Sequence, residues 1–212
     1  MRQTAIVIDN FFDNPDEIRD LALKTLEFDG NNLVNDDKRH YPGIRSNHLG
    51  VIQPELHVKL KHEIENIVGR KLPTFSSYFH ATTQIHGCGL CHADPNEVAG
   101  LIYLNHKAPE DTGTYIVDAW NGDEFRFTSE EENAFWDACE TTDFDEIEKF
   151  KNLKEEVNAA YFKQSINIEN RYNRLIVYSG QKHHAPAKYF GHNLNTARLT
   201  LVFFGFYDYW GW

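Results

Sequence analysis

The chain is poor in cysteine and in long apolar runs. Its 212 residues include only three cysteines, Cys88, Cys91 and Cys139, which is too few for the disulfide framework of a small secreted protein. No stretch approaches the roughly 20 apolar residues that span a bilayer. The N-terminal segment also lacks the pattern of a cleavable signal peptide. We therefore expect a cytoplasmic protein with no membrane-spanning segment.

Positive charge is also scarce. The 21 Lys and Arg residues face 32 Asp and Glu residues, which gives a formal net charge of −11. Nucleic acids and anionic membranes are bound mainly through basic side chains, so both partners are disfavoured. The acidity is uneven along the chain. Residues 129–158 hold eleven acidic and three basic side chains, so this segment has a net charge of −8 and the rest of the chain has a net charge of −3. This acidic segment is typical of a solvated helical face.

The hydrophobic fraction of 41% is sufficient for a packed core. Apolar residues at helical spacing predict helices over residues 15–27 and from Pro54 to about Gly69, with residues 29–50 as a loop between them. Short β-type runs occupy residues 5–8, 75–85, 90–94, 98–105, 114–119, 174–179 and 197–207. This order predicts one α+β domain with an antiparallel sheet, arranged as a sandwich or a barrel.

His92 and Asp94 are the first candidate metal ligands. They stand two residues apart in a β-type run, so both side chains point to the same face of a strand. A third ligand can come from the loop that contains His183 and His184, between two later runs. Two imidazoles and one carboxylate are the ligand set of non-haem Fe(II) oxygenases, which leave further coordination positions open.

Arg198 and Thr200 form a second pair at the same spacing. They lie in a long apolar run, where a guanidinium group needs a carboxylate partner. If the protein supplies none, a dicarboxylate ligand can provide it. The arginine fork then binds a carboxylate through two hydrogen bonds, and the threonine hydroxyl donates a third.

Taken in order, these motifs resemble the prolyl-4-hydroxylase-like branch of the 2-oxoglutarate/Fe(II)-dependent oxygenases. The resemblance runs from about Phe75 to Phe204, with a gap over the acidic segment. The matching positions are His92 and Asp94, Tyr103-Leu104-Asn105, Thr112-Gly113-Thr114, His184, and Arg198 with Thr200. The chain departs from the family pattern in its Asp-Thr-Gly-Thr turn, where relatives more often have two glycines. It also departs in the 14-residue spacing from His184 to Arg198, which is longer than is common.

The resemblance implies a double-stranded β-helix, or jelly-roll, core with N-terminal helices and an acidic helical insertion. On this interpretation residues 1–212 form a single oxygenase-like domain. Its parts are an N-terminal strand with supporting helices (1–73), the jelly-roll core (74–128 and 170–208) and the acidic insertion (129–158).

The resemblance also implies the roles of the site residues. Fe(II) would be bound by His92, Asp94 and His184. His184 is favoured over His183 because the family ligand is followed closely by a small residue or proline, here Ala185-Pro186. The far carboxylate of 2-oxoglutarate would contact Arg198, Thr200 and Tyr103. The residue that binds its other carboxylate is open, with candidates on the preceding strand: Tyr78, Thr82 and Gln84.

The implied reaction is the hydroxylation of an unactivated C–H bond with dioxygen, which releases succinate and CO2 and uses ascorbate as an optional reductant. The substrate is a protein side chain or a small molecule, and the sequence identifies neither it nor the oligomeric state. The alternative is a jelly-roll protein that binds a metal or ligand without oxidising it. A partner-docking protein without metal is a third reading.

Cys88 and Cys91 offer a different metal site. They form a Cys-x-x-Cys pair flanked by His86 and His92, and thiolates favour zinc. The sequence has no second Cys-x-x-Cys, and a redox motif would require a helix after the first cysteine. Packing of small residues at the start of a strand is the simpler explanation.

Overall fold

The computed structural model describes residues 4–29, 43–89, 91–117, 155 and 165–207. The predicted acidic insertion, 129–158, lies outside the described residues except for Glu155. Both predicted helices are present, as α1 (Pro15–Asp29) and α3 (Pro54–Val68). Proline suits the first turn of a helix because its missing N–H has no intrahelical partner there, and α3 ends at Gly69 with a left-handed φ of 68°.

A short helix, α2 (Leu49–Ile52), and a short strand, β2 (Ile44–Arg45), lie in the stretch that was predicted to be a loop. Both are too short to produce a periodic pattern. Strand β2 pairs with β3 (Thr74–Thr82), and Ser46 continues this contact, since its hydroxyl accepts a hydrogen bond from the Phe79 N–H. Tertiary pairing therefore orders this segment.

The larger sheet is antiparallel and has six strands. Their order is β1 (Ala5–Ile8), β7 (Leu175–Tyr178), β4 (Val98–Tyr103), β9 (Arg198–Phe206), β3 and β2. All residues of β4 are buried. A Cβ atom at Gly100 would lie 2.3 Å from the Ile176 carbonyl oxygen, so only glycine allows β4 to approach its neighbour this closely.

The smaller sheet has three strands in the order β6 (Ser165–Ile168), β5 (Thr114–Val117) and β8 (His184–Pro186). The sequence analysis placed the second part of the jelly-roll core at residues 170–208, and this prediction omitted β6. In the predicted run 90–94, the described residues 91–94 form an isolated bridge, from His92 to His184 on β8. Pairing with distant strands, which no local pattern encodes, creates β6 and β8.

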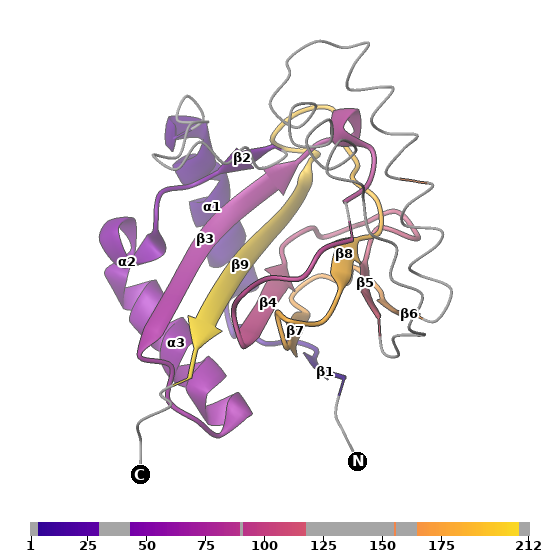
Figure 1. Cartoon of the computed structure of the whole chain (residues 1–212). Helices are drawn as coiled ribbons and strands as arrows, with labels where there is room; N and C mark the ends of the chain where they lie inside the picture. The colour runs from indigo at the N-terminus through magenta and orange to yellow at the C-terminus, as the bar shows by residue number, and fades with distance from the viewer. Residues whose placement is uncertain (1–3, 30–42, 90, 118–154, 156–164, 208–212) are drawn as a thin grey trace, which may run out of the picture.

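The larger sheet separates two hydrophobic clusters. One contains Phe79, Leu201 and Phe203 of the sheet together with Leu26 of α1 and Ile64 of α3. The other lies between the two sheets and includes residues of β4, β7 and β9 together with residues of the smaller sheet: Leu101, Ile176, Val202, Ile116 and Ile168. Helices thus cover one face of the larger sheet and the smaller sheet faces the other (Figure 1). This is the predicted α+β jelly-roll architecture.

Alternation along β9 decides which of its side chains face the smaller sheet. Leu199, Leu201 and Phe203 belong to the helix-side cluster, whereas Val202 belongs to the cluster between the sheets. Arg198 and Thr200 therefore share the face of Val202. None of the described helices is long and apolar enough to cross a membrane.

Candidate metal centre and anion pocket

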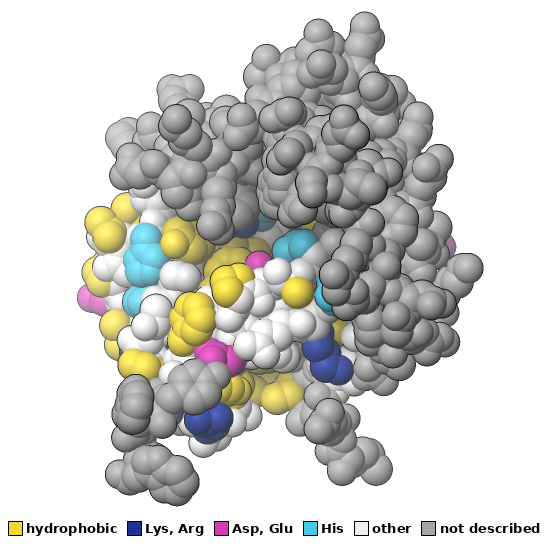
Figure 2. All heavy atoms as spheres, in the orientation of Figure 1, with side chains coloured by type: hydrophobic (Ala, Val, Ile, Leu, Met, Phe, Trp, Pro, Cys, Tyr) yellow, Lys and Arg dark blue, Asp and Glu magenta, His cyan; other side chains and the backbone are white. Residues whose placement is uncertain are grey.

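His92, Asp94 and His184 lie together between the sheets. One ligand atom from each is within 4.8 Å of the others. His92 Nε2 lies 3.7 Å from Asp94 Oδ1, and His184 Nε2 lies 3.5 Å from Asp94 Oδ2. Figure 2 shows histidine and acidic side chains among hydrophobic ones on one face of the molecule. His184 lies 90 residues beyond Asp94 in the sequence, so its meeting with the His92 and Asp94 pair is a product of the tertiary fold.

Backbone hydrogen bonds position the cluster. The His92 and His184 peptides exchange two bonds, with N···O distances of 3.1 and 2.9 Å, and the Asp94 N–H donates to the Gly180 carbonyl oxygen at 2.8 Å. A Cβ atom at Gly180 would lie 2.5 Å from the Asn96 carbonyl oxygen and 3.2 Å from Asp94 Cβ. A larger residue at position 180 would therefore displace the Asp94 segment.

The protonation states within this cluster suit a divalent metal. Nδ1 of His184 lies 2.8 Å from the Lys182 carbonyl oxygen, which can only accept a hydrogen bond. Nδ1 therefore carries the proton, and the lone pair of Nε2 faces Asp94. Burial raises the pKa of Asp94, but a proton on the facing nitrogen of His184, together with the positive charges of His92 and Arg45, outweighs burial and leaves the pKa below its ordinary value. A metal cation would take the place of these protons and stabilise the ionised carboxylate in the same way.

Asp94 Oδ2 supplies a test of whether a metal fits. This oxygen is buried and accepts no hydrogen bond from any described residue. A buried carboxylate oxygen in that state is costly unless a cation compensates for it. The set of two imidazole nitrogens and one carboxylate oxygen therefore fits a metal such as Fe(II).

Arg198 lies at the start of β9 with only 3% of its surface exposed. Its Nε donates to the Thr112 carbonyl oxygen at 3.3 Å, and its Nη2 donates to Thr114 Oγ1 at 3.4 Å. Among the described residues Arg198 has no carboxylate partner. A buried guanidinium held only by long bonds to neutral oxygens is suited to receive an anion.

Tyr103 and Thr200 lie beside Arg198. They are directly opposite each other on β4 and β9, and both are fully buried. The Tyr103 hydroxyl lies 2.7 Å from Thr114 Oγ1, and the Arg198 guanidinium carbon lies 5.3 Å from the Tyr103 ring centre. Burial raises the pKa of Tyr103, although Arg198 opposes this, so the phenol keeps its proton. The residues predicted to bind an anion thus form one buried polar cluster, the candidate anion pocket.

Asn105 supports this pocket in a way that the motif alone did not reveal. Its Nδ2 donates to the Ala197 carbonyl oxygen and its Oδ1 accepts from the Leu199 N–H, both at 2.8 Å. The amide therefore binds the backbone on each side of Arg198. The Tyr-Leu-Asn motif contained this residue, but only the fold indicates its task.

Other candidates lie outside the metal-ligand cluster. His183 is not part of it, although it is adjacent in sequence to His184. Cys88 and Cys91 are buried and unbridged, and burial raises the pKa of the Cys91 thiol to about 12. Neither cysteine joins the cluster of metal-ligating side chains found among the described residues. Of the candidates for the other carboxylate, Gln84 is exposed on the 3-10 turn η1 (Gln84–His86).

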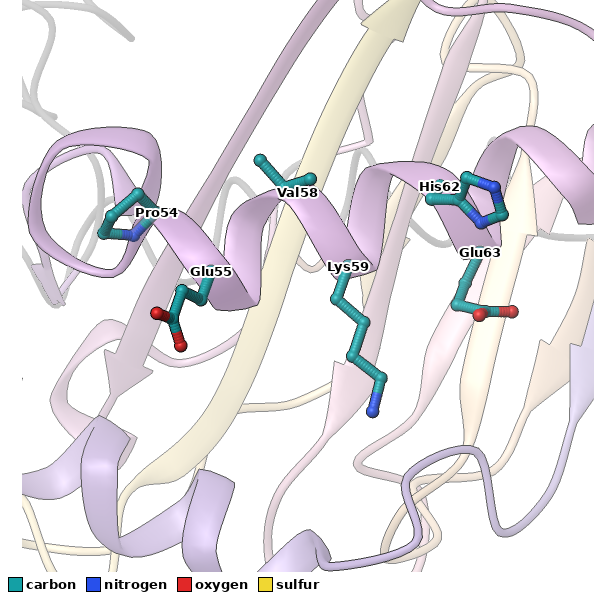
Figure 3. A pocket seen from close by; sticks show the side chains of 6 residues that line it. All are labelled: Pro54, Glu55, Val58, Lys59, His62 and Glu63. Atoms are coloured by element: carbon teal, nitrogen blue, oxygen red, sulfur yellow. The ribbon is translucent and has the colours of Figure 1, made fainter.

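A separate surface depression lies on α3. Its lining residues all come from that helix, as Figure 3 shows: Pro54, Glu55, Val58, Lys59, His62 and Glu63. Because α3 covers the helix-side face of the larger sheet, this depression is remote from the cluster between the sheets. It is not part of the candidate site.

Residues 1–205 match the model of a family of unknown function, DUF6445. The chain belongs to this family. No curated protein matches its sequence. Its fold can nevertheless be compared with solved structures.

Three similar structures are two prolyl hydroxylases and one protein solved with nickel and 2-oxoglutarate bound. A Pseudomonas putida prolyl-4-hydroxylase is 16% identical with a TM-score of 0.53, over 97% of this chain and 93% of that one. HygX from Streptomyces hygroscopicus, solved with nickel, 2-oxoglutarate and hygromycin B, is 14% identical with a TM-score of 0.57, over 96% and 83%.

The third is a Trichoplax adhaerens prolyl hydroxylase in complex with a peptide fragment of the hypoxia-inducible factor oxygen degradation domain. It is 11% identical with a TM-score of 0.55, over 96% of this chain and 83% of that one. At such low identity these similarities establish the fold alone. The fold of this DUF6445 protein resembles that of the 2-oxoglutarate/Fe(II) oxygenases, in agreement with the sequence motifs.

Proposed function

We propose that the protein is a 2-oxoglutarate/Fe(II)-dependent dioxygenase that hydroxylates a C–H bond of a small molecule or a protein side chain. This proposal rests on two complementary sites that lie between the same sheets. One is the His92, Asp94 and His184 cluster, and the other is the buried Arg198, which has no acidic partner among the described residues. A metal ion and a dicarboxylate would satisfy both. On this proposal residues 1–212 act as one domain, and the reaction takes place in the cytoplasm.

The metal would be held by His92 Nε2, His184 Nε2 and a carboxylate oxygen of Asp94. When bound, Fe(II) would supply dioxygen activation, and 2-oxoglutarate would supply two electrons as it is converted to succinate and CO2. The protein holds its three ligand side chains in place through the paired backbone bonds of His92 and His184 and through the Lys182 carbonyl. Preorganised ligands of this kind cost little to order when the metal enters.

Arg198 would select a co-substrate with a far carboxylate. Its guanidinium group would exchange two long bonds to neutral oxygens for a two-bond ion pair with a carboxylate, which is stronger and fixes the orientation of the ligand. Tyr103 keeps its proton and can donate to the same carboxylate, as can the Thr200 hydroxyl. The hydrophobic residues between the sheets would exclude water from this pocket.

The neighbouring structures include one with the small molecule hygromycin B bound and one with a peptide fragment bound. Both kinds of substrate therefore stay open for this chain. Dioxygen and ascorbate would be the remaining small molecules of the reaction, ascorbate only to restore Fe(II).

The test is the conversion of 2-oxoglutarate to succinate by the full chain with Fe(II) under air. We expect slow succinate formation that requires both Fe(II) and dioxygen and is lost in Asp94→Asn. Ser77→Ala is a matched control, because Ser77 is buried on the helix side of β3 and bonded to His57. Tight binding of metal and 2-oxoglutarate with no succinate would instead support the non-catalytic binding protein. Absence of metal binding would refute both.

A further inference from the structure

Thr82 has a buried hydroxyl group that packing alone does not explain. It is the last residue of β3 and only 1% of its surface is exposed. Its Oγ1 atom is buried and has no hydrogen-bond partner among the residues that the structure describes. A buried hydroxyl group without a partner is costly, because it has lost its bonds to water and gained none in return. Such a group in a native fold calls for an explanation, and an absent ligand is one.

The register places Thr82 at the anion pocket. Thr82 on β3 is directly opposite Arg198 on β9, and His80 is opposite Thr200. Directly opposed residues of antiparallel strands have Cβ atoms about 5 Å apart on the same face. Phe79 and Ala81 belong to the helix-side cluster, so Thr82 faces the space between the sheets, as Arg198 does.

The edge of the sheet restricts the Thr82 side chain further. A Cβ atom at Gly43 would lie 2.8 Å from Thr82 Cγ2, so the methyl group packs against this glycine. Gly43 has a φ of 90°, which favours glycine and lets the chain pass this close to β3. The methyl branch of Thr82 is therefore accommodated by the protein, whereas the hydroxyl branch is not.

We propose that the hydroxyl of Thr82 donates a hydrogen bond to the carboxylate that Arg198 binds, and so fixes the position of the dicarboxylate. This inference rests on the proposed function. It gives Thr82 a different task from that of a residue at the keto-acid end, because the register places Thr82 directly opposite Arg198. The pocket would then hold the far carboxylate with a fork from β9 and a hydroxyl from β3.

Two consequences separate this role from a structural one. In the absence of ligand, Thr82→Val removes an unsatisfied hydroxyl and keeps the shape, so the variant should unfold at a higher temperature than the wild type. In the presence of ligand, the same variant loses a bond to a carboxylate. Its affinity for 2-oxoglutarate should fall on the order of tenfold.

Thr112→Val is the matched control. Thr112 is also 1% exposed, but its hydroxyl donates to the Pro109 carbonyl oxygen at 2.7 Å. Replacing Thr112 by valine removes this hydrogen bond, so the variant should unfold at a lower temperature than the wild type. Opposite shifts in the two variants would show that the hydroxyl of Thr82 lacks a partner in the protein.

The experiment is anaerobic calorimetric titration of the Fe(II)-loaded full chain with 2-oxoglutarate and with pyruvate, which shares the 2-oxo acid end but lacks the far carboxylate. We expect Thr82→Val to weaken only 2-oxoglutarate binding and Thr82→Ser to restore it. Equal affinity of Thr82→Val and wild type for 2-oxoglutarate, or an equal loss for both ligands, would overturn the role of Thr82 and leave the proposed function intact. Failure of the wild type to bind 2-oxoglutarate would overturn both.

Discussion

The Lys182 carbonyl oxygen lies 2.8 Å from His184 Nδ1, and this contact determines which ring nitrogen faces Asp94. A carbonyl oxygen only accepts hydrogen bonds, so it holds the proton on Nδ1. Nε2 is then unprotonated, and its lone pair can bind a metal. The neighbouring His183 has no comparable place in the cluster. The backbone of the turn before β8 thus distinguishes two adjacent histidines that are chemically identical.

Metal content should respond to His184 and not to His183. His184→Ala removes a ligand nitrogen, so protein purified without chelator and loaded with one equivalent of Fe(II) should retain less than a tenth of the wild-type metal, since loss of a single ligand is costly. His183→Ala should retain wild-type metal. Elemental analysis after gel filtration measures both. If instead His183→Ala loses the metal, the ligand assignment is wrong.

Arg198→Lys should lose most of the 2-oxoglutarate affinity although it keeps the positive charge. Lysine cannot form the two parallel bonds of the arginine fork, and its shorter reach leaves the Thr112 carbonyl oxygen without its donor. We expect a Kd increase of about tenfold or more, measured by anaerobic titration.

Arg198→Met provides the comparison for stability. Removing a buried charge that has no acidic partner in the described part of the chain should leave the melting temperature unchanged or raise it, while 2-oxoglutarate binding is lost. A large fall in melting temperature without ligand would mean that Arg198 serves the fold and not a ligand.

Asn105→Ala should destabilise the protein and weaken the anion pocket together. The variant leaves the Ala197 carbonyl oxygen and the Leu199 N–H without partners in a buried region, at a cost of about 2 kcal/mol or more in unfolding free energy. Urea unfolding measures this cost. Asn193→Ala is the control, because Asn193 makes its hydrogen bonds with Thr196 in an exposed turn and should cost far less.

Stability should depend on pH through His57. Burial lowers the pKa of His57, and the nearby His48 and Lys61 lower it further. The unfolded chain, with an ordinary histidine pKa near 6.5, then binds a proton more readily than the folded protein. The stabilisation that neutral His57 provides is complete above about pH 6.5 and is lost as the pH falls below it.

His57→Asn isolates this contribution, because its amide can replace the contact between His57 Nδ1 and Ser77 Oγ, which measures 2.8 Å. Between pH 7 and pH 5 the unfolding free energy of the variant should fall less steeply than that of the wild type. Denaturant unfolding at several pH values measures the difference. Parallel curves for the two proteins would contradict the assignment to His57.

Local patterns were sufficient for much of the fold. The helical spacing of apolar residues predicted α1 and α3, and β-type runs predicted β3, β4, β5, β7 and β9, because each of these elements buries one face or both. Strands β2, β6 and β8 have between two and four residues. They are strands because a partner from another part of the chain supplies their hydrogen bonds, which a single sequence does not record.

The sequence by itself determined the chemical types at the site: a His-x-Asp pair, later histidines, and an Arg-x-Thr pair on a strand. Residue spacing within one strand places side chains on a common face, so these pairs were visible locally. The tertiary structure alone decided which distant groups meet. It brought His184 to Asp94, placed Asn105 against the backbone around Arg198, and set Thr82 opposite Arg198, because strand register is chosen by the burial of whole faces and not by any one residue.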